Sequence, residues 1–229
     1  MMTEKQRLLN LLHENKISAD DFKILLAALD KKPSGFAKMV LFLINPFQKI
    51  TGWPALLLGI MIAVVMSYVC WQEKFYIFSI LDIARNTAVP HPKVAFTFWL
   101  LLYQNAVNIG VLALVYILMA KLFRQKNVRI IDFFGMVAVA RLPSLIVMVG
   151  VILVLKFMPT LQFLAIRPNL ITSIYSLFVN VVILWQLAIY FYALKEASGL
   201  TGNKLIFAAF SSLILGTILT EQLTMFFVY

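Results

Sequence analysis

The sequence predicts an all-α membrane protein in which five transmembrane helices follow a small cytoplasmic αα-hairpin. Hydrophobic residues make up 62% of the 229 residues and charged residues only 13%, which is far from the composition of a soluble domain. Five apolar blocks each approach the ~20 residues that a helix needs to cross a hydrocarbon core. None shows the alternation of a membrane β-strand, and backbone amides in lipid must be satisfied internally, so each block is expected to be a helix.

Residues 1–32 are expected to form an amphipathic helical hairpin. Four leucines within positions 8–12 gather on one side of a short helix, and a second apolar face lies within positions 22–29. Ser18 occupies the N-cap position of the second helix. Because such a hairpin is too small to bury a core alone, residues 3–30 are expected to dock on a second copy, another protein or the membrane surface. A passive cytoplasmic cap is the alternative.

Residues 33–52 connect this hairpin to the membrane. The run Pro33-Ser34-Gly35 ends the helix and serves as a linker. The stretch 36–50 then mixes phenylalanines with lysines, which is typical of a segment that lies in the membrane interface.

Residues 53–229 are expected to form the five-helix membrane domain. The spans are predicted at 53–71, 96–120, 134–156, 170–194 and 204–228. The apolar part of 72–95 is too short to cross the membrane, so this loop is expected at the headgroups of the outer face. Glycines in 199–203 predict the turn between the last two helices.

The distribution of lysine and arginine predicts the topology. Fourteen of the 20 lie before the first span or in the loops after the second and fourth spans, five lie in the other two loops, and Arg141 is inside a span. The positive-inside rule then places the N-terminus in the cytoplasm and the C-terminus outside. The net charge of +10 is interpreted as a topology signal that also meets anionic lipid, and not as a nucleic-acid-binding surface.

Two predicted helices carry small residues at every fourth position, which lets helix backbones approach closely in lipid. These residues are Gly59, Ala63 and Ser67 in the first span and Ala208, Ser212 and Gly216 in the fifth. The two ridges are expected to pack within the chain, and contact across a dimer is the alternative.

Polar side chains inside the spans are candidate functional residues, because they are unfavourable in lipid unless they bond internally or line a path. The candidates are Gln104, Asn105, Asn108, Arg141, Asn180, Gln186 and Glu221. Helical spacing predicts that the three amides of the second span and Asn180 of the fourth face inward. Arg141 is expected to bond Gln186 or Glu196. Glu221 is expected to be protonated or hydrated from outside, too far in depth from Arg141 to pair with it.

The sequence offers no constellation for catalysis. Neither histidine has a second ligand at metal-binding spacing, and Cys70 is the only cysteine. A catalytic triad, a phosphate loop or a pair of carboxylates at one membrane depth cannot be assembled. We therefore expect a protein that is not an enzyme, with no catalytic, cofactor-binding or metal site and no cofactor.

Short motifs in this chain resemble the Yip-one domain family of five-span membrane proteins, over about position 46 to the end. The motifs are Asn45-Pro46-Phe47, Ala140-Arg141-Leu142-Pro143, Trp185-Gln186-Leu187 and Ala193-Leu194-Lys195-Glu196-Ala197-Ser198-Gly199-Leu200. The resemblance implies a role in membrane organisation or vesicle trafficking, where the N-terminal region of eukaryotic members contacts prenylated small GTPases. The compact N-terminal hairpin departs from their long arm. It is similar to bacterial members and to SHOCT-type hairpin modules, which implies the bacterial cytoplasmic (inner) membrane and a docking or oligomerisation role.

Two functions are expected from these features. In the first, the protein is a membrane scaffold or adaptor, in which polar residues fix helix register and residues 3–30 form a homo-oligomer or dock a protein partner. In the second, it is a transporter or channel-like protein that moves an ion, lipid or small solute through a polar cavity between the helices.

Overall fold

The computed structural model describes residues 9, 11–14, 17–18, 20–23, 26, 35–77, 83–85, 94–125, 129–157 and 170–228. The chain divides into two compact units, Met1–Leu43 and Ile44–Tyr229.

In the N-terminal unit, Ser18 caps a helical turn at 20–23, as its position predicts. The backbone N–H of Asp21 donates to Ser18 Oγ at 3.1 Å, and Ser18 Oγ donates to Asp21 Oδ2 at 2.7 Å. This side chain satisfies an N–H that the first helical turn leaves without a partner. Most of the predicted hairpin packing lies outside the described residues.

Helix α3 (Gly35–Ile44) follows the linker. Its phenylalanines and most of its other large apolar side chains are exposed, Phe36 the most at 72%. A short helix with exposed apolar residues and a lysine is typical of the membrane interface, and the placement of 36–50 in that interface stays a prediction.

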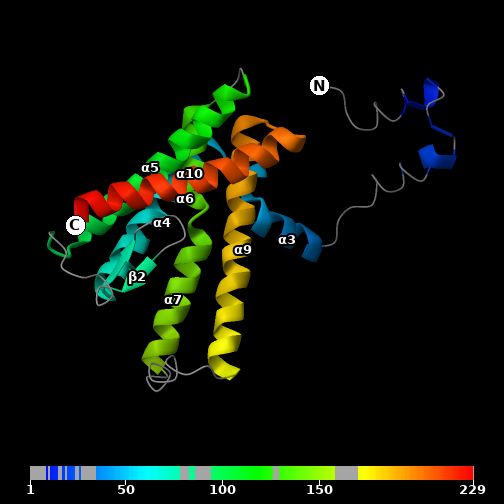
Figure 1. Ribbon diagram of the computed structural model, residues 1–229. Helices are drawn as coiled ribbons and strands as arrows, with labels where there is room; N and C mark the ends of the chain where they lie inside the picture. The colour runs from blue at the N-terminus through cyan, green and yellow to red at the C-terminus, as the bar shows by residue number, and fades with distance from the viewer. Residues whose placement is uncertain are drawn as a thin grey trace. The chain divides into compact units, whose positions relative to one another are not determined.

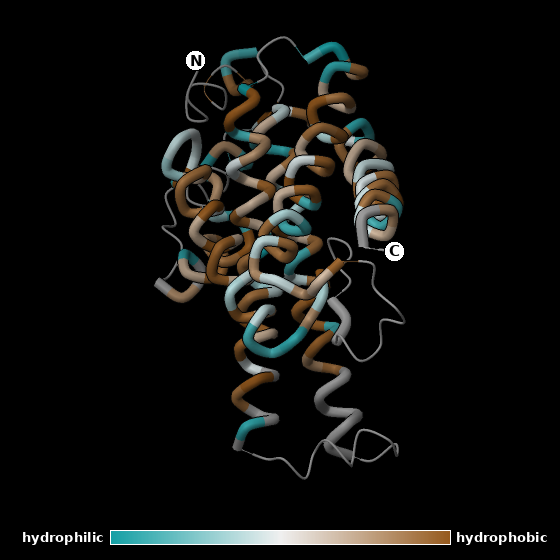
Figure 2. Tube along the Cα trace, turned by 90° about the vertical axis from the view of Figure 1, so that its left-hand side faces the viewer, coloured by the Kyte–Doolittle hydropathy of each residue, from teal (hydrophilic) through white to brown (hydrophobic). Residues whose placement is uncertain are grey.

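The membrane domain contains five helical segments long and apolar enough to span a membrane (Figures 1 and 2). They are α4 (Gly52–Gln72), α5 (Phe98–Leu122), α6 (Ile130–Val139) continued by α7 (Leu142–Phe157), α9 (Leu170–Ser198) and α10 (Gly202–Val228). The fold is that of an all-α integral membrane protein, as the composition predicts. Gly199 and Gly202 both have positive φ at the turn between α9 and α10, which confirms the glycine-based prediction.

The third predicted span differs from a single helix, because it begins at Ile130 and breaks between α6 and α7. Pro143 explains the break. Its ring lacks an N–H and would clash with the carbonyl of Val139 in a continuous helix. The chain instead turns at Ala140 and Arg141, where the N–H of Arg141 donates to the carbonyl of Ala138 at 3.3 Å.

The segment predicted as a headgroup loop contains a small antiparallel hairpin. Strand β1 (Phe75–Ile77) pairs with β2 (Ile83–Arg85), with Tyr76 opposite Ala84. Tyr76 and Ile77 are fully buried, and the N–H of Ile77 donates to Gln104 Oε1 at 3.1 Å. The expectation that this part of 72–95 lies only at the headgroups is therefore corrected, because Lys74, with φ of 58°, turns the chain back onto the helices.

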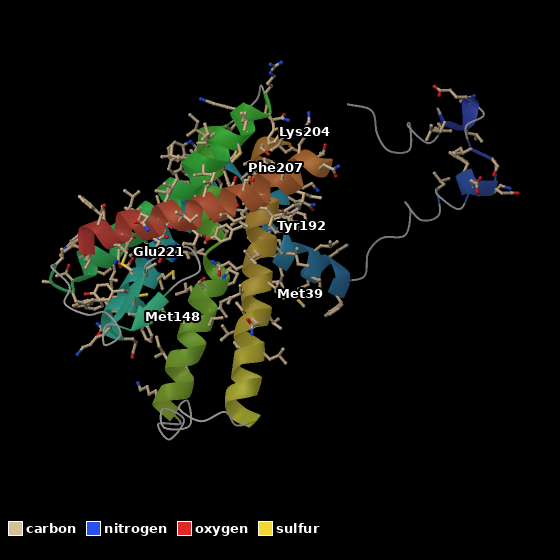
Figure 3. The ribbon with its side chains drawn as sticks, viewed as in Figure 1. Met39, Met148, Tyr192, Lys204, Phe207 and Glu221 are labelled. Atoms are coloured by element: carbon tan, nitrogen blue, oxygen red, sulfur yellow. The ribbon has the colours of Figure 1, made fainter. Side chains whose placement is uncertain are left out.

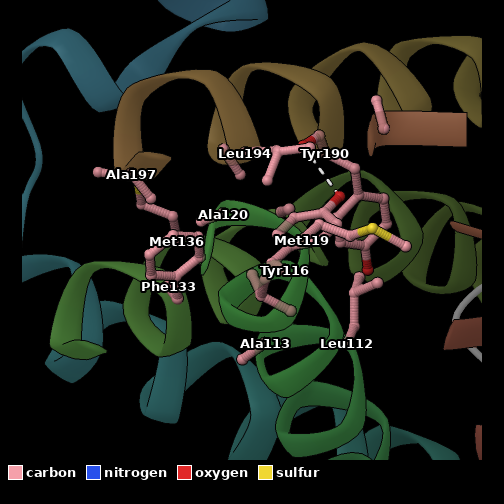
Figure 4. Packing of buried hydrophobic residues seen from close by; sticks show 14 of the residues in the cluster. Leu112, Ala113, Tyr116, Met119, Ala120, Phe133, Met136, Tyr190, Leu194 and Ala197 are labelled. Atoms are coloured by element: carbon pink, nitrogen blue, oxygen red, sulfur yellow. Dashed lines mark hydrogen bonds between the residues drawn. The ribbon is translucent and has the colours of Figure 1, made fainter. Parts of the chain in front are cut away.

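The main hydrophobic core lies between α5, α6, α9 and α10 (Figure 4). Tyr116 of α5 and Tyr190 of α9 are both fully buried there, and the Tyr116 hydroxyl donates to the Tyr190 carbonyl at 3.0 Å. This bond satisfies a buried hydroxyl and joins the second and fourth spans.

Helices α4 and α6 pack with their backbones in close contact. A Cβ added at Gly135 would lie 2.7 Å from the backbone nitrogen of Leu56, and one added at Gly59 would overlap the Cβ of Ala138. Only glycine fits at these two points. Gly59 was predicted as a packing residue from the first span alone, whereas its partner Gly135 was not.

Candidate functional site

The three amides predicted to face inward on α5 are fully buried, which confirms their orientation. Asn105 Nδ2 donates to Ser67 Oγ at 2.7 Å and to the carbonyl of Ala63 at 3.3 Å. Gln104 accepts from the N–H of Ile77 in β1. Asn108 Nδ2 donates within the helix to the carbonyl of Gln104 at 2.8 Å. The amides thus join α5 to α4 and to the β1–β2 hairpin.

Each of these amides also has one buried polar atom with no hydrogen-bond partner among the residues that the structure describes: Gln104 Nε2, Asn105 Oδ1 and Asn108 Oδ1. A buried polar atom without a partner is destabilising. The amide cluster therefore fixes helix register and keeps hydrogen-bonding capacity in the core.

Arg141 is the largest of the fully buried side chains among the described residues, and 1% of its surface is exposed. Arg141 lies at the break between α6 and α7. It is the twelfth of the 21 residues in the third span. Nε, Nη1 and Nη2 all lack hydrogen-bond partners within the described part of the chain. The inward orientation agrees with the prediction.

The predicted partners of Arg141 are wrong, because both bind other groups. Gln186 Oε1 accepts from the hydroxyl of Ser144, which α7 holds only three residues beyond Arg141. Glu196 Oε1 accepts from Asn45 Nδ2 at 2.9 Å, and it lies near the end of α9, ~15 Å along the helix from Gln186.

Two neutral side chains interact electrostatically with Arg141. Tyr190 of α9 and Cys70 of α4 lie close enough to interact electrostatically with its guanidinium. Tyr190 accepts a long bond of 3.4 Å from Gln186 Nε2, and Cys70 Sγ lies 3.2 Å from Met148 Sδ. Both neighbours of the guanidinium are thus in contact with other side chains, Cys70 with α7 and Tyr190 within α9.

Asn180 does not face inward, in contrast to the prediction, since its side chain is exposed on α9. The buried face of α9 includes Val182 and Gln186, and two residues along a helix correspond to a turn of about 200°. Asn180 therefore lies on the far side of α9.

Glu221 is half-buried on α10 (Figure 3). It forms no ion pair with Arg141 in the part of the chain that the structure describes, which agrees with the depths estimated from the sequence. Its hydration or protonation stays a prediction.

All six small residues predicted to form packing ridges are buried. Those of α4 face α6 and α5, and α10 packs mainly on α5. The ridges therefore contribute contacts within the chain, as expected.

An apolar groove of about 350 Å³ lies between α4, α5 and α6. Ile60, Ala106 and Phe134 are among its lining side chains. Its chemistry suits an acyl chain and differs from that of a polar path.

Sequence reasoning missed several residues that hold these elements. Asp132 accepts from the N–H of Gly52 at 2.6 Å, and Ser144 binds Gln186. The position of Asp132 in the first turn of α6 was a usable signal for a capping role. The pairing with Gly52 depends on tertiary contact.

Among the described residues, no group of three or more histidine, cysteine, aspartate or glutamate side chains could hold a metal ion. In comparisons with known proteins, no family model, curated protein or solved structure matches this chain.

Proposed function

We propose that this protein is a non-enzymatic membrane scaffold or adaptor of the Yip-like type. The helix bundle holds the N-terminal residues 3–30 at the membrane surface, and these residues dock a second copy or another protein. We further propose the bacterial inner membrane, with the N-terminus in the cytoplasm, on the charge distribution described above.

The scaffold proposal is supported mainly by the hydrogen bonds of the buried amides, which join separate segments of the protein. Asn105 binds two groups of α4, and Gln104 binds Ile77 of the β1–β2 hairpin. These bonds join segments that are distant in sequence, which is the role of polar residues that fix helix register in lipid.

The family resemblance has support from one contact. Asn45 and Glu196 belong to two of the motifs that resemble the Yip family, and they are hydrogen-bonded to each other. Phe47, from the first of these motifs, is buried in the main core. Motifs 151 residues apart thus contribute to one end of the bundle.

A docking role for the N-terminal residues has support from their exposed leucines. Leu9 is 44% and Leu11 36% exposed on a short helical turn. Apolar side chains on a segment too small to form a core favour a partner.

The test is cross-linking of the full chain in its native membrane, comparing wild type with the double variant Leu9→Glu/Leu11→Glu. We expect the double variant to lose at least one cross-linked species, because the charges oppose burial in an interface. Asn10→Glu, which helical spacing puts on the opposite side, is the matched control and should keep the wild-type pattern. Identical patterns in all three proteins would contradict the proposal.

A second candidate is transport, and the break at Arg141 favours it. Substrate sites in transporters often lie near the bilayer midplane at interrupted helices. Uptake of a radiolabelled anion into liposomes that contain the purified protein would support this candidate. Uptake equal to that of empty liposomes leaves the scaffold as the better proposal.

A further inference from the structure

We infer that Arg141 is the core of an oxyanion-binding site at the middle of the third span, which takes the phosphate or carboxylate group of a small solute or lipid headgroup. This inference goes beyond the scaffold function and does not depend on it.

The buried charge of Arg141 has no counter-charge among the described residues. A guanidinium is always charged and carries five N–H donors. That of Arg141 is 1% exposed, and none of its three nitrogens has a hydrogen-bond partner in the described ranges. An isolated buried ion is strongly destabilising. A bound anion would therefore offset much of the free-energy cost of burying the guanidinium.

The carboxylates of the membrane domain do not supply this counter-charge within the described residues. Asp132 accepts from Gly52, and Glu196 accepts from Asn45. Glu221 makes no ion pair with Arg141, and the two groups in electrostatic contact with the guanidinium, Tyr190 and Cys70, are neutral.

The break between α6 and α7 is a second feature that favours an anion at this position. Helix α7 starts at Leu142, next to Arg141, and runs for 16 residues. Its N-terminus is the positive end of the helix dipole and carries N–H groups without intrahelical acceptors. The positive end of a helix and a buried cation thus share one position, and both favour an anion.

Tyr190 provides a second donor. Its oxygen accepts from Gln186 Nε2, which leaves the hydroxyl proton free to donate to an anion. A guanidinium and a hydroxyl together match two oxygens of one planar or tetrahedral oxyanion. The enclosure of Arg141 favours a compact group over a bulky one.

The experiment measures the melting temperature of the purified full chain in neutral detergent while inorganic phosphate replaces chloride at constant ionic strength. We expect wild type to gain about 3 to 6 °C at a phosphate concentration ten times Kd. Arg141→Met should show no gain, and without phosphate it should melt at or above the wild-type temperature, because the unpaired buried charge is removed.

Two further variants keep the test decisive if Arg141→Met does not fold. Tyr190→Phe retains the ring and should reduce the phosphate-induced gain by half or more. Arg129→Met removes the same charge from an exposed position and should respond like wild type.

A second experiment distinguishes a lipid headgroup from a free solute as the bound oxyanion. Wild type and Arg141→Met are compared in nanodiscs of phosphatidylglycerol and of phosphatidylcholine. An Arg141-dependent gain in phosphatidylglycerol alone assigns the site to a lipid headgroup, and a gain with free phosphate assigns it to a solute. The inference is overturned if wild type, Arg141→Met and Tyr190→Phe respond equally to phosphate, and wild type and Arg141→Met respond equally to the two lipids.

Discussion

Some polar residues inside the spans bind protein groups, and others have no hydrogen-bond partner among the described residues. Asn105 donates to a side chain and to a carbonyl of α4, whereas Arg141 is buried with three unpartnered nitrogens among the described residues. Both were predicted to face inward, because lipid excludes them. Their partners could not be predicted, since a hydrogen bond depends on shifts of a few ångströms between helices, and sequence spacing fixes only direction and depth.

The hydrogen bonds of the Asn105 amide should contribute to stability. Asn105→Leu should lower the free energy of unfolding by about 0.6 to 1.7 kcal/mol, the range for interhelical hydrogen bonds in membranes. Unfolding of the full chain by a denaturing detergent measures the difference. Gln222→Leu is the control, because Gln222 is an exposed amide in a span. A loss in Gln222→Leu as large as that in Asn105→Leu would argue against a specific bond.

The positions of individual helices were predicted well where a long apolar block alone determines them. The starts of α4, α5, α9 and α10 lie within two residues of the predicted spans, because the length of an apolar block is matched to the bilayer. The break at Arg141 and the β1–β2 hairpin were not predicted. Pro143 was visible as a helix breaker, but the inward path of Tyr76 and Ile77 depends on contacts with α5.

The close contact between α4 and α6 should make the glycines at this contact intolerant of larger residues. Gly59→Ala and Gly135→Ala should each lose about 1 to 3 kcal/mol of stability, because the added methyl group meets atoms of the facing helix. In Gly110→Ala the methyl group meets nothing within 4 Å, so this variant should be neutral or gain up to about 1 kcal/mol from helix propensity. The measurement is thermal unfolding in detergent. Equal effects at all three positions would exclude close packing as the reason for glycine.

At the scale of the whole domain, two hydrogen bonds connect segments that five crossings would leave on one side of the membrane. The N–H of Gly52, at the start of the first span, donates to Asp132 in the first turn of the third, and Asn45 donates to Glu196 near the end of the fourth. The β1–β2 hairpin instead contacts α5 through Gln104 near the start of that helix. This alternation was predicted from the charges, because the positive-inside rule depends on counts and not on contacts.

The most direct test of the central claim, an odd number of crossings with lipid as the solvent, is labelling with a membrane-impermeant thiol reagent. Cys70 is first replaced by alanine, and single cysteines are then placed at Ser34 and after Tyr229. We predict that in intact cells only the C-terminal cysteine reacts, and that Ser34→Cys reacts after the membrane is permeabilised. Reaction of both cysteines from the same side would contradict the five-span topology.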